Sequence, residues 1–324
     1  MGNSDERITV IVPYYNEHDN LPYLLERVSE QTLQPNEVIL VDSGGNDGSS
    51  KLVDDWIGRQ HLSIQFRNLH ASTNTPGGSK SAGVRASQND LVAFMDCGLT
   101  FPKEWLQRQS ALLVETGADW VSGVCLTKGT TLVDKAAIAH TYGFETARPV
   151  IPGSLVRRSV FDKIGLFKDL RAGYDAEWAR ASERGGLRRE INRAVVLEYH
   201  GVNFAASLSG VFLKSLRYAR PSAGRDDTIV PYVYALGFSF GLAAVIATFA
   251  GLVSSVSLVV AAALYLSARL MIASRKSSGF SSLIANPLQF LALCTVAVVM
   301  DIGKTVGFIT GLFIRYVLRR RLVA

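Results

Sequence analysis

Two short runs of apolar, mostly β-branched residues open the chain, and each run ends in polar residues. The first run, Ile8–Pro13, leads to Asn16 and Glu17, and the second, Glu37–Val41, leads to Asp42. Leucines and a valine recur at helical spacing between them. Apolar strands separated by a helix predict a parallel sheet covered on both faces, in which ligands bind at the carboxyl ends of the strands. The polar residues are therefore expected at a ligand site.

The local pattern gives Asp42 two interpretations. A carboxylate at the end of a parallel strand suits hydrogen bonding to the base or ribose of a nucleotide. Asp is also a common cap of turns and helices, and a Gly-rich segment follows it here. Both interpretations stay open at this point.

The alternation of helical and strand patterns continues to about residue 125. Helices are expected over 49–57, 79–87 and 102–115, and strands over 63–68, 91–95 and 120–124. This order predicts an α/β domain whose mostly parallel sheet has helices on both faces. From about residue 125 to about Tyr199 the pattern is less regular.

The composition changes near Thr228. Residues 228–268 contain no Asp, Glu, Lys or Arg, which is enough for about two membrane spans. Helices are expected over 229–250 and 251–273, because a helix satisfies its own backbone polar groups in lipid. The tail therefore predicts a membrane domain.

A third apolar stretch, residues 287–314, is harder to interpret because Asp301 and Lys304 lie in its middle. These two residues are one turn apart and are expected to pair, and charges inside a membrane are candidates for function. A single crossing would place Arg315 and the arginines at 319–321 outside, against the positive-inside rule. Re-entrant or interfacial helices would keep them inside, so both arrangements stay open.

The positive charge of the chain is concentrated in this tail. Residues 229–324 hold eight basic residues and one acidic residue, which leaves 26 and 27 of the totals of 34 and 28 for the remainder. A basic, apolar tail indicates a membrane with anionic lipid and argues against nucleic acid as a partner. The three cysteines lack metal-type spacing, and the polar N-terminus predicts no signal peptide.

The opening strands resemble the family-2 glycosyltransferases. The segments VIVPYYNE and VILVDSGGNDGS are similar to the first motifs of that family, and the resemblance runs from about Ile8 to about Arg220. It implies the GT-A fold, in which the first strand and the Asp after the second strand hold the nucleotide of a sugar donor. The residues that it implies for donor binding here are Pro13, Tyr15, Glu17, Asp42 and Gly44.

A second block, LVAFMDCGL, places Asp96 after a buried strand, where the family normally presents Asp-x-Asp. The resemblance implies that Asp96 binds the donor through Mg²⁺ or Mn²⁺, which acts as a Lewis acid on the departing oxygen. Gly98 replaces the second Asp, but Mg²⁺ sites often use few protein ligands. His200 is implied as a further ligand near the metal or diphosphate. The alternatives are a structural Asp without metal and a structural His.

The segment TPGGSKSAG, residues 75–83, resembles the family's G-x-x-x-A-R-N-x-G stretch. Lys80 occupies the Arg position, which implies contact with donor phosphate without the bidentate geometry of Arg. Gly77 and Gly78 would allow the backbone to approach closely. The alternative is an ordinary glycine-rich helix start.

The segment LRAGYDAEW, residues 170–178, resembles the family's G-E-D-x-[DE]-[LW] stretch. Asp175 stands in the position of the base, and Tyr174 replaces the preceding Glu. An inverting transfer needs a base that takes the proton of the acceptor hydroxyl. The alternative for Asp175 is a helix N-cap.

Lys214, Arg217 and Arg220 lie three residues apart just before the apolar tail, on one face of an expected helix. The block resembles the R-Y-G-R of exopolysaccharide-assembling members such as the succinoglycan type. Arg217 and Arg220 are therefore expected to bind the phosphate of a lipid-linked acceptor, or else anionic headgroups. The block differs from the Q-x-x-R-W of processive synthases, which favours transfer of a single sugar.

These observations predict a GT-A domain over residues 1–225, with a donor half to about 125 and an acceptor half from 126. A membrane domain with two to three transmembrane or re-entrant helices is expected over 226–324. The implied reaction is inverting transfer of one sugar from a UDP-linked donor to a hydroxyl of a lipid-linked, polyprenyl-type or membrane-proximal glycan acceptor. The expected location is the bacterial inner membrane, multi-pass, with the catalytic domain facing the cytoplasm, and self-association into a homo-oligomer stays open.

Two other functions remain under consideration. A catalytically inactive nucleotide-sugar-binding scaffold is suggested by Gly98 and Tyr174, which both depart from the family's motifs. A dinucleotide-binding membrane oxidoreductase is disfavoured, because no G-x-G-x-x-G follows the first strand.

Overall fold

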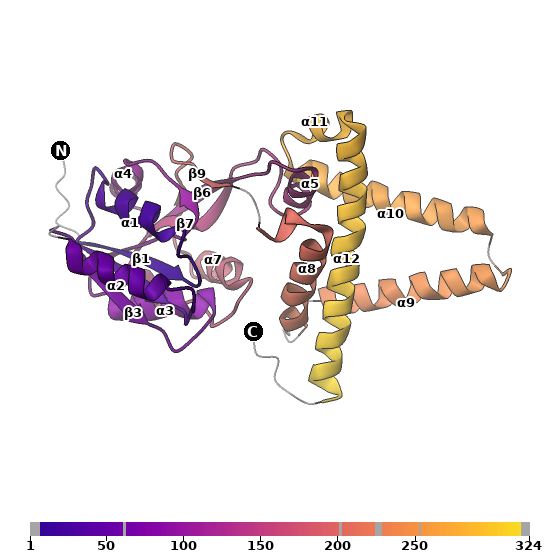
Figure 1. Ribbon diagram of the computed structural model, residues 1–324, viewed down its shortest axis with the longest axis horizontal. Coiled ribbons are helices and arrows are strands. Elements are labelled where there is room, and N and C mark those ends of the chain that lie inside the picture. The colour runs from indigo at the N-terminus through magenta and orange to yellow at the C-terminus, as the bar shows by residue number, and fades with distance from the viewer. Residues whose placement is uncertain (1–6, 61–62, 201–202, 224–228, 253, 319–324) are drawn as a thin grey trace. The chain divides into compact units, whose positions relative to one another are not determined.

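The computed structural model describes residues 7–60, 63–200, 203–223, 229–252 and 254–318 (Figure 1). The described residues up to Leu126 and from Ala147 to His200 form one compact unit, here called the sheet unit. Those from Thr127 to Thr146 and beyond Gly201 form a second, the helical unit. Residues 127–146 and 203–223 therefore pack with the helical unit, although they precede residue 225. The boundary near 225 between a catalytic and a membrane domain stays a prediction.

The sheet unit is built on a mixed sheet in the order β3-β2-β1-β4-β7-β6-β9-β5, with β8 beside β6. The strands are β1 (Ile8–Tyr14), β2 (Glu37–Asp42), β3 (Gln65–His70), β4 (Leu91–Phe94), β5 (Leu99–Thr100), β6 (Trp120–Lys128), β7 (Arg148–Arg157), β8 (Arg189–Ile191) and β9 (Leu197–His200). β3, β2, β1 and β4 are parallel, and β7 runs antiparallel to β4. The expected α/β fold is confirmed.

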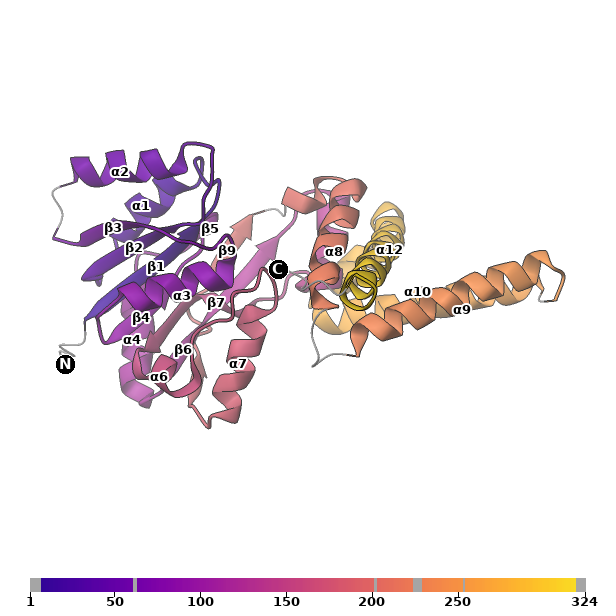
Figure 2. The ribbon, with the colours of Figure 1, turned by 90° about the horizontal axis from the view of Figure 1, so that it is seen from below.

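Helices cover both faces of this sheet (Figure 2). They are α1 (Leu21–Ser29), α2 (Ser49–Arg59), α3 (Pro76–Ala86), α4 (Trp105–Thr116), α6 (Ser159–Ile164) and α7 (Tyr174–Arg184). Because strand side chains alternate between faces, Val10 and Val12 pack with α1, α2 and α4, while Ile11 packs with α3, α6 and α7. Burial on both faces explains why the first strands are almost continuously apolar.

The strand register brings the polar ends of the parallel strands to one edge of the sheet. Tyr14 lies opposite Asp42, and Ile11 lies opposite Phe94, two residues before Asp96. The residues that follow β1, β2 and β4 therefore gather at the carboxyl edge, where ligands bind in open α/β sheets.

The helical unit contains α5 (Leu132–Thr141), η1 (Asn203–Ala206), α8 (Leu208–Ser222), α9 (Val230–Phe249), α10 (Ser255–Lys276), α11 (Phe280–Ala285) and α12 (Pro287–Tyr316). α9, α10 and α12 are long and apolar enough to cross a membrane, as the sequence predicts. Only 6% of the most apolar window of α9 and of α10 is buried, against 39% for α12. The exposed apolar surface of these helices indicates association with a membrane.

α12 is one continuous helix that runs crosswise to the hairpin of α9 and α10 (Figures 1 and 2). In both views it lies at the open end of the hairpin, beside α8. The stretch over 287–314 is thus not a re-entrant pair of helices. The arginines at 319–321 lie outside the described residues.

Three glycines spaced four residues apart let α12 approach α8 closely. A Cβ at Gly303 would lie 2.7 Å from the carbonyl oxygen of Phe212, and one at Gly307 would lie 2.6 Å from that of Leu216. A Cβ at Gly311 would meet the carbonyl group of Arg220 in the same way. This small-xxx-small arrangement is typical of closely packed helices in membranes.

Gly307→Leu is expected to separate α8 from α12, because its side chain would meet the α8 backbone. Overpacking of this kind costs about 1–3 kcal/mol, so the thermal unfolding midpoint in detergent should fall. Gly241→Leu on α9 is the matched control, because a Cβ at Gly241 has no atom within 4 Å. Equal midpoints for the two variants would show that the glycines are not packed as described.

Candidate active site

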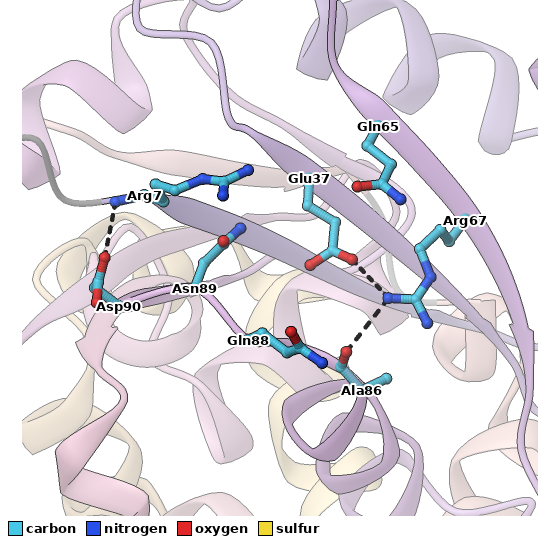
Figure 3. Close-up of a pocket in the computed structure, with 8 residues that line it drawn as sticks. All are labelled: Arg7, Glu37, Gln65, Arg67, Ala86, Gln88, Asn89 and Asp90. Atoms are coloured by element: carbon cyan, nitrogen blue, oxygen red, sulfur yellow. Dashed lines mark hydrogen bonds and ion pairs between the residues drawn. The ribbon is translucent and has the colours of Figure 1, made fainter.

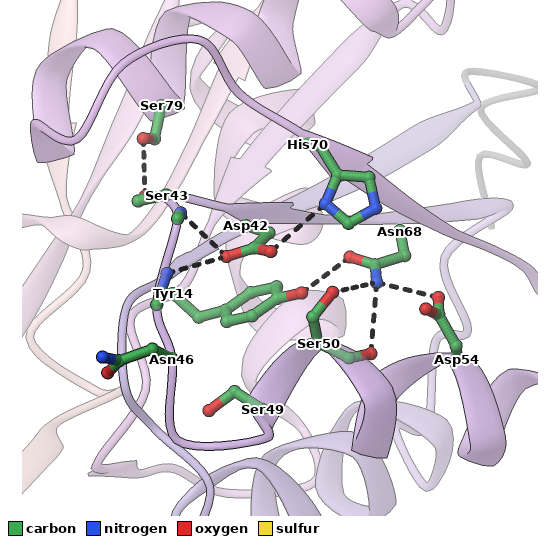
Figure 4. Close-up of polar contacts among 12 residues, drawn as sticks. Tyr14, Asp42, Ser43, Asn46, Ser49, Ser50, Asp54, Asn68, His70 and Ser79 are labelled. Carbon is green, nitrogen blue, oxygen red and sulfur yellow. Dashed lines mark hydrogen bonds and ion pairs between the residues drawn. The ribbon is translucent and has the colours of Figure 1, made fainter.

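Asp42, at the end of β2, has both carboxylate oxygens engaged. Oδ1 accepts hydrogen bonds from the backbone N–H groups of Gly44 at 2.9 Å and Gly45 at 3.4 Å, and Oδ2 lies 3.2 Å from Nδ1 of His70 (Figure 4). Gly44 has φ of 82°, a conformation that favours glycine. The turn-capping interpretation of Asp42 is therefore correct, and it leaves the nucleotide-binding interpretation open.

A polar network lies beside Asp42. The Tyr14 hydroxyl donates to Oδ1 of Asn68 at 2.8 Å, and Nδ2 of Asn68 donates to Oδ1 of Asp54 at 2.8 Å (Figure 4). Burial raises the pKa of Tyr14 to about 12, so its hydroxyl stays protonated. No motif in the sequence points to Asn68 or His70, which lie among other polar residues on the edge strand β3.

The segment after β1 is folded against the turn after β2. The Glu17 N–H donates to Oγ of Ser49 at 2.9 Å, and the Glu17 carboxylate accepts from Nδ2 of Asn20 at 2.6 Å. Burial raises the pKa of Glu17; the Asn20 hydrogen bond opposes this, and the charge of Asp96 adds to it. The two predicted site residues Glu17 and Asp96 are therefore close enough for the charge of Asp96 to affect the pKa of Glu17. Tyr15 is exposed at 52%.

Pro13 is the half-buried penultimate residue of β1 and pairs with Val41. It thus places the chain that follows, including Tyr15 and Glu17, at the carboxyl edge of the sheet.

The Asp96 carboxylate forms an ion pair with a buried lysine. Nζ of Lys80, on α3, lies 2.5 Å from Oδ1 of Asp96, and the Lys80 side chain has no exposed surface. Burial alone would lower the pKa of Lys80, but Asp96 and Tyr174 outweigh it, and the pKa rises above its ordinary value. The Asp96 side chain keeps 37% of its surface exposed. A ligand at this edge would therefore contact the Asp96 carboxylate directly. The buried Lys80 would act on the ligand through its charge and by holding Asp96 in place.

Tyr174 completes this group from the first residue of α7. The Lys80 Nζ lies 5.6 Å from the centroid of its ring, and burial raises the pKa of the Tyr174 hydroxyl to about 12. A neutral phenol in place of the family's Glu thus adds no further negative charge beside Asp96. The contact also ties the start of α7 to the Lys80–Asp96 pair.

Asp175 follows Tyr174 and is the second residue of α7. The N-cap position is Gly173, with φ of 77°, and no side chain caps the helix there. The N-cap interpretation of Asp175 is therefore wrong. Within the described part of the chain the Asp175 carboxylate has no hydrogen-bond or ion-pair partner, whereas Glu177, one turn along, pairs with Lys168.

The glycines before Lys80 serve contact between segments of the protein. A Cβ at Gly77 would collide with the carbonyl oxygen of Lys168, and one at Gly78 would lie 2.5 Å from Oδ1 of Asp169. The hydroxyls of Thr73 and Thr75 both donate to the same carboxylate. These glycines therefore allow close packing against the segment that leads into α7, and an approach of their backbone to donor phosphate stays a prediction.

The described residues place few metal-binding side chains around Asp96; the Glu17 carboxylate is near enough for its pKa to respond to the Asp96 charge. The described residues contain no group of three or more His, Cys, Asp or Glu side chains that could hold a cation. His200 lies on β9, where Nε2 is 3.3 Å from Oγ1 of Thr100 and 3.3 Å from Oε2 of Glu198. Gly98 has φ of 77°, which favours glycine over a second Asp. These few protein ligands fit a cation that is held mainly by water and by the phosphates of a bound nucleotide sugar.

Arg217 and Arg220 lie on α8, in the helical unit, and both are exposed. Burial lowers the pKa of the neighbouring Lys214 to about 8. The predicted phosphate-binding role of the two arginines stays a prediction.

A polar groove lies at the opposite, amino edge of the same sheet (Figure 3). Its volume is about 410 Å³, and its lining includes Glu37 and Gln65, which begin β2 and β3. Arg67 and Glu37 neutralise each other there at 2.6 Å. Ligands of parallel sheets bind at the carboxyl edge, so this groove is not the candidate site.

The sequence matches the profile of the Glycosyl transferase family 2 over residues 9–176, more than half of the chain. Glycosyltransferase AglE of Haloferax volcanii is 26% identical over 196 residues, which cover 55% of this chain and 62% of that protein. The undecaprenyl-phosphate 4-deoxy-4-formamido-L-arabinose transferase of Aeromonas hydrophila is 34% identical over 112 residues, 33% of this chain and 34% of that enzyme. The matches thus span less than two thirds of these relatives' own lengths.

The fold is similar to that of a solved GT-A enzyme. The mannosyltransferase PcManGT from Pyrobaculum calidifontis, solved with GDP-Man and Mn²⁺, aligns with a TM-score of 0.57 and 16% identity. The alignment covers 93% of this chain and 88% of that one. The resemblance to the succinoglycan type in particular stays a prediction.

Proposed function

Because the chain belongs to the Glycosyl transferase family 2, and is thus a glycosyltransferase, we propose that it transfers one sugar with inversion from a nucleoside-diphosphate sugar. The donor is a UDP-sugar, and the acceptor is a hydroxyl of a lipid-linked or membrane-proximal glycan. Asp42 and Gly44 bind the nucleotide, with Pro13, Tyr15 and Glu17 beside them. Lys80 and Asp96 lie at the diphosphate.

The observation that carries this proposal is the state of Asp175. Its carboxylate has no partner in the described part of the chain, yet it directly follows Tyr174, which contacts Lys80 of the Lys80–Asp96 pair. A base must be free to accept a proton and must lie beside the reacting groups. The Asp175 carboxylate is free to accept a proton. That it lies beside the reacting groups is part of the proposal.

A divalent cation, Mg²⁺ or Mn²⁺, fits at Asp96 together with the donor phosphates and, in the proposal, His200. When bound there it neutralises charge on the departing diphosphate. The protein's own contribution is the buried ammonium of Lys80, which holds Asp96 in place and supplies a fixed positive charge.

A second acceptor class is favoured by the names of the relatives, several of which are undecaprenyl-phosphate sugar transferases. A lipid phosphate is already ionised and needs no base. The unengaged carboxylate of Asp175 favours a hydroxyl instead, and Arg217 and Arg220 would then bind the phosphate that links the acceptor glycan to its lipid.

The two acceptor classes give chemically different products. With radiolabelled donor and membrane lipid extract, transfer to a hydroxyl should give a product in which mild acid leaves the label within a larger saccharide, because the new glycosidic bond survives. Transfer to a lipid phosphate would give a sugar phosphodiester from which mild acid releases the labelled monosaccharide. Release of most of the label as the monosaccharide would overturn the hydroxyl acceptor and leave the donor assignments intact.

The crosswise course of α12 suggests a membrane placement. We place the α9–α10 hairpin in the inner membrane and α12 along its cytoplasmic surface, so that Arg315 stays on the cytoplasmic side with α8. This placement removes the conflict with the positive-inside rule that a third crossing creates. Protease should cleave a C-terminal tag in inside-out vesicles but not in right-side-out vesicles. The reverse pattern would contradict this placement.

Asp42→Asn is expected to weaken donor binding about tenfold or more, because hydrogen bonds to a charged acceptor are worth about 1.5–3 kcal/mol. Calorimetric titration with the nucleoside diphosphate measures this. Asp55→Asn on α2, an exposed position, is the matched control and should bind as the unaltered protein does. Unchanged affinity in Asp42→Asn would restrict Asp42 to its turn-capping role.

A further inference from the structure

A cluster of charged and phenolic side chains joins the three longest helices of the helical unit. At its centre is Asp301 of α12, whose Oδ1 accepts a hydrogen bond from Tyr234 of α9 and whose Oδ2 accepts one from Tyr265 of α10, each at 3.0 Å. Nε of Arg269 lies 3.0 Å from Oδ2, and Nζ of Lys304 lies 3.6 Å from Oδ1. The expected pairing of Asp301 with Lys304 is confirmed, and Arg269 shares the same carboxylate.

The cluster contains two cationic side chains and one anionic one. Its members are largely buried: the exposed fractions are 13% for Arg269, 16% for Asp301 and 28% for Lys304. The two oxygens of Asp301 already accept two hydrogen bonds from tyrosines and pair with two cationic groups, so the carboxylate has little capacity left. The cluster therefore has an excess of positive charge and of donors.

Arg269 has donors left over. Its Nη2 atom is buried and has no hydrogen-bond partner among the described residues. A guanidinium carries five N–H donors in a planar fork, and leaving them unpaired in a buried setting is costly. An acceptor with negative charge would satisfy both the donors and the excess charge.

His140 of α5 lies close enough to feel the same charges. Burial lowers the pKa of His140 to about 4, and the nearby Arg269 acts in the same direction. Nε2 of this neutral ring lies 3.0 Å from the carbonyl oxygen of Leu293, and its Nδ1 is buried without a partner in the described part of the chain. His140 thus neither compensates the cations nor adds a third.

The cluster lies near one end of the α9–α10 hairpin. Tyr234 is four residues into α9, and Arg269 is seven residues before the end of α10 at Lys276. At 1.5 Å per residue, both are within about 10 Å of those helix ends. For a hairpin inserted in a membrane, this depth corresponds to the level of the lipid headgroups rather than to the centre of the bilayer.

We propose that Arg269 and Lys304, oriented by Asp301, form a binding site for a phosphate group, supplied by an anionic lipid headgroup or by free phosphate. The fork of a guanidinium matches two phosphate oxygens, and an ammonium adds a second charge-assisted contact. Asp301 holds both cations in place, and the two tyrosines fix Asp301 between α9 and α10. The site does not depend on the proposed glycosyl transfer.

The test uses the full-length protein in nanodiscs of phosphatidylcholine with increasing phosphatidic acid, and a second series with inorganic phosphate. The thermal unfolding midpoint reports binding, and native mass spectrometry counts bound lipid. The thermal unfolding midpoint of the unaltered protein should rise and saturate, with one molecule of phosphatidic acid or phosphate bound per chain. Arg269→Met should raise the apparent dissociation constant about tenfold or more. Arg275→Met, an exposed arginine on the same helix, is the matched control and should behave as the unaltered protein does.

Saturation by phosphatidic acid alone assigns a headgroup site, and saturation by inorganic phosphate assigns a free-phosphate site. No saturable effect of either in the unaltered protein would overturn the proposal, as would equal dissociation constants for Arg269→Met and Arg275→Met. If Arg269→Met does not fold, Lys304→Met takes its place, and the measurement on the unaltered protein still decides. A cluster that only joins helices would lose stability in these variants without any dependence on phosphate.

Discussion

Asp175→Asn is expected to lower turnover by about 10²–10⁴-fold, the range that a positioned general base contributes. The amide has nearly the same shape as the carboxylate but cannot take the acceptor proton. Because Asp175 makes no hydrogen bond or ion pair within the described part of the chain, its replacement disturbs little else. Loss of a negative charge near the N-terminus of α7 should cost no more than about 1 kcal/mol. Donor affinity, measured by titration, should stay the same.

Glu177→Gln is the matched control for this variant. It removes a carboxylate from the same helix, one that is already paired with Lys168, and should leave turnover within a few-fold of the unaltered rate. A full rate in Asp175→Asn would exclude Asp175 as the base and would favour an acceptor that is already ionised.

Lys80→Met is expected to reduce both stability and activity. It removes the partner of Asp96 and leaves that carboxylate beside the negative charge of Glu17. Breaking a buried ion pair costs about 3–5 kcal/mol, and the exposed part of Asp96 should bring this down to about 2–3 kcal/mol. Denaturant unfolding measures the loss, and turnover should fall at least about tenfold because the fixed charge at the diphosphate is gone.

The double variant Lys80→Met with Asp96→Asn tests whether the two residues act as a pair. Removing both charges should restore part of the stability and none of the activity. Lys51→Met, at an exposed position on α2, is the control for loss of a lysine. Additive losses of stability would show that the pair is not coupled.

The pH dependence of this pair follows from the direction of the lysine pKa. The folded-state pKa of Lys80 lies above its ordinary value of 10.5. Its contribution to stability is therefore fully present below about pH 10.5 and is lost as the pH rises through the folded pKa. The pair should thus stay intact throughout the neutral range.

The order of elements could be predicted from the sequence because the periods of the apolar residues differ between strands and helices. β1 and β2 end where the apolar runs meet polar residues, and α9 and α10 follow from the long stretch without charge. The direction of α12 could not be predicted in this way. It depends on the packing of Gly303, Gly307 and Gly311 against α8, and an apolar run says nothing about the angle at which it meets its neighbours.

The candidate site could be predicted only in part for a similar reason. Asp42, Asp96 and Asp175 stand at motif positions, and strand ends share an edge of the sheet. The pairing of Lys80 with Asp96 and its contact with Tyr174 join segments 16 and 94 residues apart, and no local pattern encodes such contacts. The sequence marked Tyr174 in one way only, because this residue stands where the family's motif has Glu.

The most direct test of the account is release of nucleoside diphosphate by the detergent-purified protein, across a panel of nucleotide sugars, with and without Mn²⁺ and with membrane lipid extract. We predict release with one uridine-linked donor that depends on the lipid extract and falls at least about a hundredfold in Asp175→Asn. Donors that bind without any release, when the lipid extract supports transfer by another glycosyltransferase, would contradict catalysis and favour a nucleotide-sugar-binding scaffold.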